Sequence, residues 1–206
     1  MKLIELIIDE EMEMSGIDAI SIVESPAIEE NFIALKDEFK KEYKFAEISA
    51  EKRIIMGALL VPDKPIYRRD ETEGEYYIYF SKDTIRKCME LFFQNGNQSN
   101  ATFEHMETVT GLTMVESWIV EDTEMDKSKM YNLNVPVGTW MGTIKVGNDV
   151  IWNDFVKTGK VKGFSIEGYF ADKAKIPLSR INNEEDEIMA GLELLEIKSL
   201  FDNYGK

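Results

Sequence analysis

Cysteine and histidine are nearly absent from this 206-residue sequence, and both shortages exclude kinds of site. Cys88 is the one cysteine, so no internal disulfide can form, and we expect a buried, reduced thiol in a reducing compartment. His105 is the one histidine, and neither a cysteine pair nor an aspartate-rich calcium loop occurs. Residues 138–147 lack the Lys-Ser/Thr ending of a phosphate-binding loop. We therefore expect no metal and no cofactor.

Long apolar runs and excess positive charge are also missing. No window approaches the roughly 18 uninterrupted apolar residues of a membrane span, so we expect no membrane partner. The first five residues already include an acidic one, Glu5, which is unlike a signal peptide. Lysine and arginine total 24 against 39 acidic residues, a net charge of −15. Because phosphate backbones attract basic surfaces, we expect no nucleic-acid partner.

The sequence is rich enough in apolar residues to form a substantial core. Hydrophobic residues make up 44% of the chain and aromatic residues 11%, which suits one main domain. Residues 36–52 are rich in lysine and glutamate and indicate a solvated connector. We therefore predict an N-terminal strand and connector region at residues 1–50, packed on a main domain at residues 51–206. The apolar spacing of residues 188–205 predicts a C-terminal helix in that domain.

Short β-prone segments outnumber helical ones. A helix is predicted from the N-cap Ser81 to the turn at Gly96, and a second one over 148–159. Residues 66–74 are predicted to form a charged loop. This pattern favours an α+β fold, a mainly antiparallel sheet or barrel with peripheral helices. The predicted strands lie at 2–9, 20–25, 53–61, 75–80, 101–106, 112–120, 135–146 and 161–170.

Residues 161–170 contain one serine, Ser165, among apolar and aromatic residues. The two-residue period of a strand places Ser165 and Glu167 on one face, with Phe164 and Ile166 on the other. Glycines at 163 and 168 bracket this serine, which suggests that another backbone comes close. The simplest alternative is a half-buried strand with a tolerated serine.

A serine nucleophile needs a base, and in this chain a histidine base can only be His105. We expect His105 on the strand 101–106, on the face opposite Glu104. A third group would orient the imidazole, and without a second histidine it must be a carboxylate or be absent. Glu167 is a candidate because it shares the face of Ser165. Glu116 is the alternative, because it lies among apolar residues where a carboxylate requires a partner.

These segments, in this order, resemble a known protease family. A strand with a lone histidine precedes Val115-Glu116-Ser117-Trp118-Ile119, Gly138-Thr139-Trp140, a short helix with Trp152, and Gly163-Phe164-Ser165-Ile166-Glu167-Gly168-Tyr169. The earlier segment Ala19-Ile20-Ser21-Ile22-Val23-Glu24-Ser25-Pro26-Ala27 resembles the Ser-Leu-Val-x-x-Pro-Ala segment of the same group. The chain thus resembles the XkdF-like serine proteases of tailed phages, relatives of the prohead (capsid maturation) proteases.

The resemblance implies an assemblin-like β-barrel ringed by helices, and a serine endopeptidase of capsid maturation. By position, Ser165 matches the family serine and His105 the family histidine. The implied substrates are the scaffold and the extensions of the major capsid protein, inside the prohead in the host cytoplasm, with self-cleavage included. A homo-oligomer and the oxyanion donors (Arg180 or amides near Gly163) are left open. The alternative is a non-catalytic phage structural or assembly protein with the protease fold.

Overall fold

The computed structural model describes residues 2–9, 11–12, 15–28, 33–34, 52–70 and 74–173. Contacts between residues divide the chain into two compact units, Met1–Ala171 and Asp172–Lys206. The predicted connector, residues 36–52, lies almost wholly outside the described residues, and so does the predicted C-terminal helix at 188–205. The proposed boundary near residue 50 therefore remains a prediction. Within the described residues, no helix is long and apolar enough to cross a membrane.

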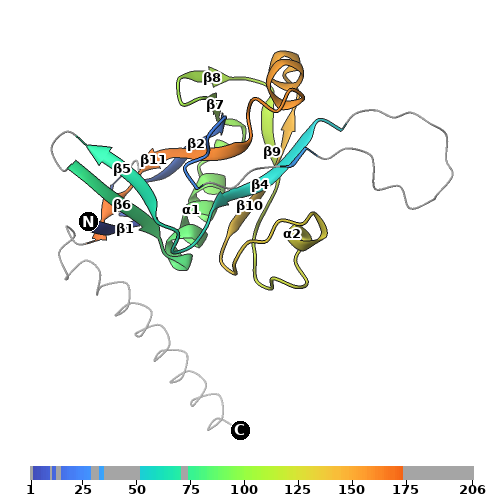
Figure 1. Ribbon diagram of the computed structural model, residues 1–206. Helices are drawn as coiled ribbons and strands as arrows, with labels where there is room; N and C mark the ends of the chain where they lie inside the picture. Colours follow the sequence, from blue (N-terminus) through green and yellow to red (C-terminus); the bar gives the residue numbers. More distant parts are fainter. Residues whose placement is uncertain are drawn as a thin grey trace, which may run out of the picture. The chain divides into compact units, whose positions relative to one another are not determined.

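Three four-stranded sheets form the described part of the fold (Figure 1). The first has the order β12 (Ala171–Asp172), β1 (Lys2–Ile7), β6 (Gly74–Phe80), β5 (Ile66–Asp70). The second has the order β3 (Ile33–Ala34), β4 (Ile54–Leu60), β10 (Trp140–Val146), β9 (Leu112–Ile119). The third has the order β11 (Gly163–Tyr169), β2 (Gly16–Val23), β7 (Ala101–Phe103), β8 (Glu107–Val109).

The α+β class is confirmed, but the predicted closed barrel is wrong. The described strands form open sheets, of which the first and the third mix parallel and antiparallel pairs, whereas the second is antiparallel throughout. β1 pairs with β6 in parallel and β2 pairs with β7 in parallel, whereas β11 pairs with β2 in antiparallel fashion. Both parallel partners of β1 and β2 come from much later in the chain. Alternation within a strand indicates which face is buried but not which strand lies beside it, so the pattern could not reveal the open arrangement.

Helix α1 (Lys82–Gln94) confirms the prediction for this segment. The Ser81 side chain caps it by accepting a hydrogen bond from Thr84 N at 3.4 Å. Gly96 ends it in the left-handed conformation, with φ 73°. Ile85, Cys88 and Phe92 recur at helical spacing and are fully buried. In Figure 1 the helix passes close to β2, so its apolar face supports the sheet that carries Ser165.

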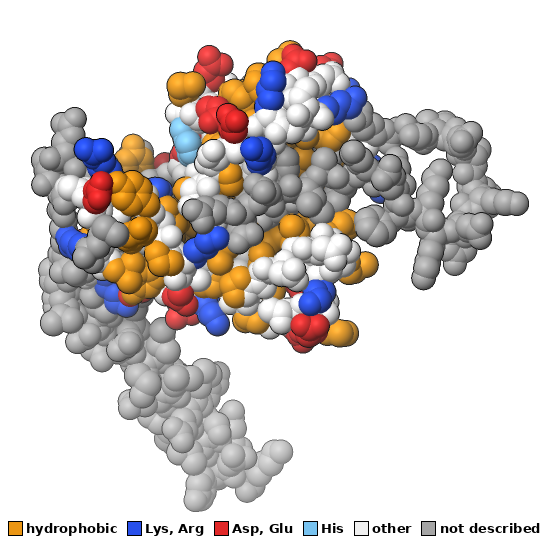
Figure 2. Space-filling view, viewed as in Figure 1, with side chains coloured by type: hydrophobic (Ala, Val, Ile, Leu, Met, Phe, Trp, Pro, Cys, Tyr) orange, Lys and Arg blue, Asp and Glu red, His pale blue; other side chains and the backbone are white. Residues whose placement is uncertain are grey.

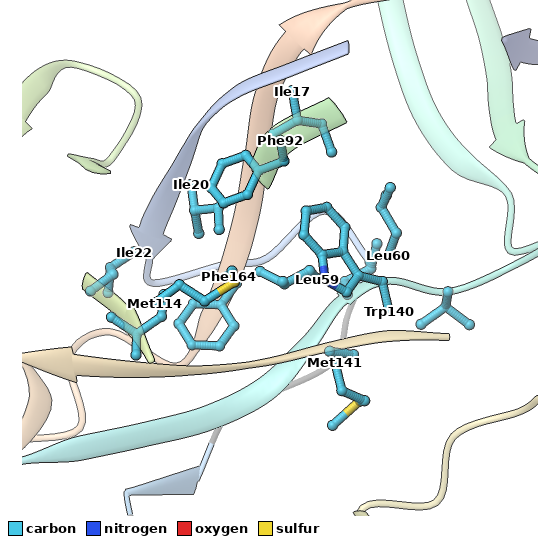
Figure 3. Packing of buried hydrophobic residues seen from close by; sticks show 14 of the residues in the cluster. Ile17, Ile20, Ile22, Leu59, Leu60, Phe92, Met114, Trp140, Met141 and Phe164 are labelled. Carbon is cyan, nitrogen blue, oxygen red and sulfur yellow. The ribbon is translucent and has the colours of Figure 1, made fainter. Parts of the chain in front are cut away.

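The core joins α1 to the sheets through large side chains. Phe92 meets Trp140 edge to face, with ring centroids 5.6 Å apart. Figure 3 shows Phe164 near Met114 within the same buried cluster. Phe164 is 0% exposed, so one face of β11 is fixed to the core and its other face must point away from it.

Two predictions for shorter segments had different outcomes. The helix predicted at 148–159 is a six-residue π-helix, η2 (Ile151–Val156), and Asn148 Oδ1 accepts from Ile151 N at 3.0 Å. The loop predicted at 66–74 is wrong, because β5 pairs with β6 there in a hairpin. The remaining short helices of the described part are η1 (Asn97–Ser99) and α2 (Lys127–Met130).

Candidate active site

Ser165 lies in the middle of β11, on the face opposite the core, as the alternation predicts. Phe164 is 0% exposed, whereas Ser165 is 9% exposed and the Glu167 side chain 32%. A strand rises about 3.3 Å per residue, so the α-carbons of Ser165 and Glu167 are about 7 Å apart on one face. Glu167 is therefore the next residue after Ser165 on this face of β11.

The neighbouring strands bring two more hydroxyl groups into line with Ser165. Ser21 of β2 is directly opposite Ser165 of β11, and Thr102 of β7 is directly opposite Ser21. Residues opposite one another in a sheet point to the same face, so three hydroxyl side chains cross the sheet in a row. Ser21, in the centre, is 0% exposed.

His105 occupies a tight turn, and its predicted place on a strand is wrong. β7 ends at Phe103, and Met106 N donates to Phe103 O at 3.0 Å across the turn. The two central residues, Glu104 and His105, have φ of 50° and 57°. Left-handed non-glycine residues cost about 1–3 kcal/mol each, so the surrounding contacts must hold this turn. The turn carries the imidazole past the end of β7 and over the neighbouring strand.

The imidazole of His105 contacts Glu167. His105 Nδ1 lies 3.0 Å from Glu167 Oε1, and Thr102 Oγ1 donates to the same oxygen. An ionised carboxylate can only accept hydrogen bonds, so Nδ1 carries a proton in this pair and Nε2 of the neutral ring is an acceptor. The side chain of His105 is 42% exposed, and the chain's single histidine is visible on the surface in Figure 2. A substrate could therefore reach the ring.

The serine and the histidine are not hydrogen-bonded to each other. Among the residues that the structure describes, no hydrogen bond joins Ser165 Oγ to His105. The structure thus brings His105 together with Glu167, which lies two residues after Ser165 on β11. Catalytic hydrogen bonds are often long without substrate and tighten in the complex.

A β-bulge and a glycine set the place of Glu167. The register of β11 against β2 shifts between Glu167 and Gly168, and Asp18 of β2 is the extra residue. A Cβ added at Gly168 would lie 2.0 Å from Gly16 O, so only glycine fits. The close backbone approach predicted from the paired glycines is confirmed at Gly168.

Glu116, the alternative third member, lies in another sheet. It is on β9, and Lys127 Nζ donates to its Oε2 at 2.5 Å. The hydrogen bond from Lys127 is the main reason that the pKa of Glu116 is lowered from its usual value. An open pocket of about 310 Å³ beside it is lined by Met89, Phe93, Met114, Val115, Glu116 and Ser117. The structure thus pairs Glu167, and not Glu116, with His105.

Other side chains considered in the sequence analysis are buried or hydrogen-bonded within the fold. Cys88 is buried, which raises its pKa to about 12. Trp140 and Trp152 are buried in the core, and Trp118 donates to Asp126 Oδ2 at 3.1 Å. No cluster of three or more metal-ligating side chains occurs among the described residues. Arg180, considered as an oxyanion donor, lies outside them.

Sequence reasoning assigned no role to Ser21 or Thr102. Both side chains contact the His105–Glu167 pair, Ser21 through the backbone of His105 and Thr102 through the carboxylate. Ser21 opens the segment that resembles the Ser-Leu-Val-x-x-Pro-Ala motif, which was the one available signal. Nothing in the local sequence could show that β2 lies between β7 and β11.

The described site holds a serine, Ser165, on the same strand as the carboxylate that contacts His105. Serine hydrolases use these three residue types. The family model described as "Putative phage serine protease XkdF" matches residues 42–174, well over half of the chain. The chain belongs to this family. No curated protein and no solved structure matches it.

Proposed function

We propose that this chain is a serine endopeptidase with Ser165 as nucleophile, His105 as general base and Glu167 as the group that orients His105. The observation that carries the proposal is the 3.0 Å contact between His105 Nδ1 and Glu167 Oε1. Glu167 lies two residues after Ser165 on the same face of β11. Membership of a phage serine protease family supports the same assignment.

The chemistry follows from the proton positions. Ser165 Oγ forms a bond to the scissile carbonyl carbon while its proton moves to Nε2 of His105. The same proton passes to the leaving amine as the peptide bond breaks, which leaves an acyl-enzyme. Water then hydrolyses the ester through the same base, and the free serine returns. Glu167 keeps the proton on Nδ1 and stabilises the imidazolium that forms in each step.

The substrates that we propose are the scaffold protein and the extensions of the major capsid protein, cleaved inside the prohead. The family description supports a phage protease. The resemblance to the prohead proteases implies these assembly proteins as its substrates. Self-cleavage of the same chain belongs to the proposal.

Co-expression with the phage's own scaffold and capsid proteins tests the proposal. Cleavage products, identified by mass spectrometry, should appear with the wild type and be absent with Ser165→Ala. Ser99→Ala is the matched control, because among the described residues the hydroxyl of this exposed serine hydrogen-bonds only to Thr113, at 3.1 Å. Products that persist with Ser165→Ala would exclude Ser165 as the nucleophile.

One observation favours a second function, a non-catalytic structural or assembly role. Ser165 is 9% exposed, and the described structure contains no hydrogen bond from it to His105. A protein that kept the fold without the activity would leave scaffold and capsid proteins uncut in the same experiment. It would still enter proheads, and Ser165→Ala would not change the yield of particles.

A further inference from the structure

The left-handed turn that carries His105 is held by the end of β2. Three contacts join them: His105 N donates to Ser21 Oγ at 3.0 Å, and Glu104 N donates to Ile22 O at 3.2 Å. In the third, Glu24 N donates to Glu104 Oε1 at 2.7 Å. Ser21 and Ile22 of β2, and Glu24 just after it, all belong to the segment Ser21–Ala27, to which the proposed mechanism assigns no role.

The turn needs these contacts because its own sequence does not favour it. Turns with positive φ at both central residues are formed mostly by asparagine, aspartate and glycine. Here a glutamate and a histidine have φ of 50° and 57°. Without partners, the backbone of His105 would relax to the ordinary region and swing the imidazole away from its present direction.

Ser21 is the one side chain in this set that bonds the backbone of His105 itself. Its hydroxyl is 0% exposed, so no water competes for the acceptor. The hydroxyl also reaches Thr102 O, at the longer distance of 3.5 Å. Ser21 is directly opposite Ser165 in the register of β2 and β11. The hydrogen bond from His105 N to Ser21 Oγ therefore fixes the position of the turn along these two strands.

We propose that Ser21 is the positioning residue of the active site: its buried hydroxyl fixes the His105 backbone, so that Nδ1 meets Glu167 and Nε2 is available to Ser165. The inference rests on the proposed function, and it adds a fourth residue to the machinery. Two anchors then hold the histidine. Ser21 fixes its main chain from β2, and Glu167 fixes its ring from β11.

The experiment uses the full-length chain labelled with ¹⁵N at histidine. Because the chain has one histidine, the two ring-nitrogen signals need no assignment. In the wild type at neutral pH, these signals should report one tautomer, with the proton on Nδ1. In Ser21→Ala they should shift towards the average of a freely exchanging ring. The rate of labelling by a fluorophosphonate should fall about ten- to a hundredfold, as expected for a misplaced catalytic group.

Two further variants separate positioning from general loss of structure. Ser21→Thr keeps a hydroxyl acceptor and should restore both the nitrogen shifts and the labelling rate. Ile144 lies on β10 in the second sheet and is 3% exposed. Ile144→Val shortens this buried side chain and should leave the histidine signals as in the wild type.

The nitrogen shifts keep this inference distinct from the proposed function, because they require no activity. Wild-type shifts and labelling in Ser21→Ala would overturn the inference and leave Ser165 as nucleophile untouched. The inference would also be overturned if Ser21→Thr failed to restore the nitrogen shifts and the labelling rate. It would likewise be overturned if Ile144→Val changed the histidine shifts as Ser21→Ala does. Failure of the proposed function would appear instead as labelling that survives Ser165→Ala.

Discussion

Glu167 Oε1 is the atom at which the polar contacts of the site converge. It accepts from Thr102 Oγ1 and lies 3.0 Å from His105 Nδ1. Two donors on one carboxylate oxygen fix its rotamer, and a fixed carboxylate in turn selects one tautomer of the ring. The threonine therefore helps to orient the histidine without touching it.

Replacing each candidate carboxylate in turn shows which of the two orients His105. Glu167→Gln removes the charge that stabilises the imidazolium and admits the wrong tautomer, so fluorophosphonate labelling should slow by about 10³–10⁴-fold. Glu116→Gln should leave the labelling rate within about threefold, because Glu116 lies in another sheet and its ion pair with Lys127 is exposed. A large loss in Glu116→Gln with an unchanged Glu167→Gln would reverse the assignment.

At the scale of single residues, the alternation of side chains along a strand predicts part of the candidate site. It predicts that Ser165 and Glu167 share one face and that Phe164 lies on the other, and the structure buries Phe164 completely in the core. It fails at His105, because a turn with positive φ lacks its usual glycine or asparagine there. Tertiary contacts from β2 stabilise that turn, and a local pattern cannot report them.

At the scale of elements, the pairing of β11 with β2 determines where the site forms. The bulge at Asp18 and the glycine at 168 let the two backbones approach. The bulge lies immediately after the Glu167–Ala19 pair, so the irregular part of the ladder adjoins the carboxylate that contacts His105. β2 also separates β11 from β7, so His105 must reach across it.

Gly168→Ala tests this close approach. The added Cβ would lie 2.0 Å from Gly16 O and 2.8 Å from Ile17 Cα, so the two strands must separate. We expect a loss of about 3 kcal/mol in the free energy of unfolding, the upper part of the range for overpacking, measured by urea denaturation. Gly159→Ala is the control: with φ 69° and no atom within 4 Å, it should cost only about 1–2 kcal/mol. An equal or smaller loss in Gly168→Ala would contradict the account.

Elements with strong local signals could be predicted from the sequence, and those without could not. The cap at Ser81 and the apolar spacing of Ile85 and Phe92 identify α1. The sequence of β5, Ile-Tyr-Arg-Arg-Asp, is charged and looks like a loop, yet pairing with β6 makes it a strand. Which distant strands pair with each other depends on the packing of the whole chain. The sequence of a single strand therefore does not indicate its partner.

At the scale of the described molecule, α1 and the aromatic core hold the sheets that carry the site. Phe92 of α1 packs on Trp140 of β10, and Phe164 of β11 enters the same cluster. The β11 strand is thereby fixed on its buried face, so that its polar face presents Ser165 and Glu167 with little freedom. Such rigid support is what an active site requires.

The adjacent phenylalanines of α1 offer a matched test of this support. Phe92 is 0% exposed and Phe93 is 37% exposed. Phe92→Ala should lower the free energy of unfolding by about 3–5 kcal/mol, because it leaves a cavity beside Trp140. Phe93→Ala should cost about 1 kcal/mol, since a partly exposed ring loses less contact with the protein. Urea denaturation of both variants measures the difference in the free energy of unfolding. Equal losses in the two variants would contradict the packing of Phe92 in the core.

The central claim is that Ser165 is a nucleophile activated by His105. The most direct measurement is labelling of the purified chain with a fluorophosphonate, followed by mass spectrometry to locate the modified residue. We predict one label, on Ser165, that is lost in Ser165→Ala, strongly reduced in His105→Ala and unchanged in Ser99→Ala. Labelling that persists in Ser165→Ala, or a wild-type chain that is never labelled, would contradict the account.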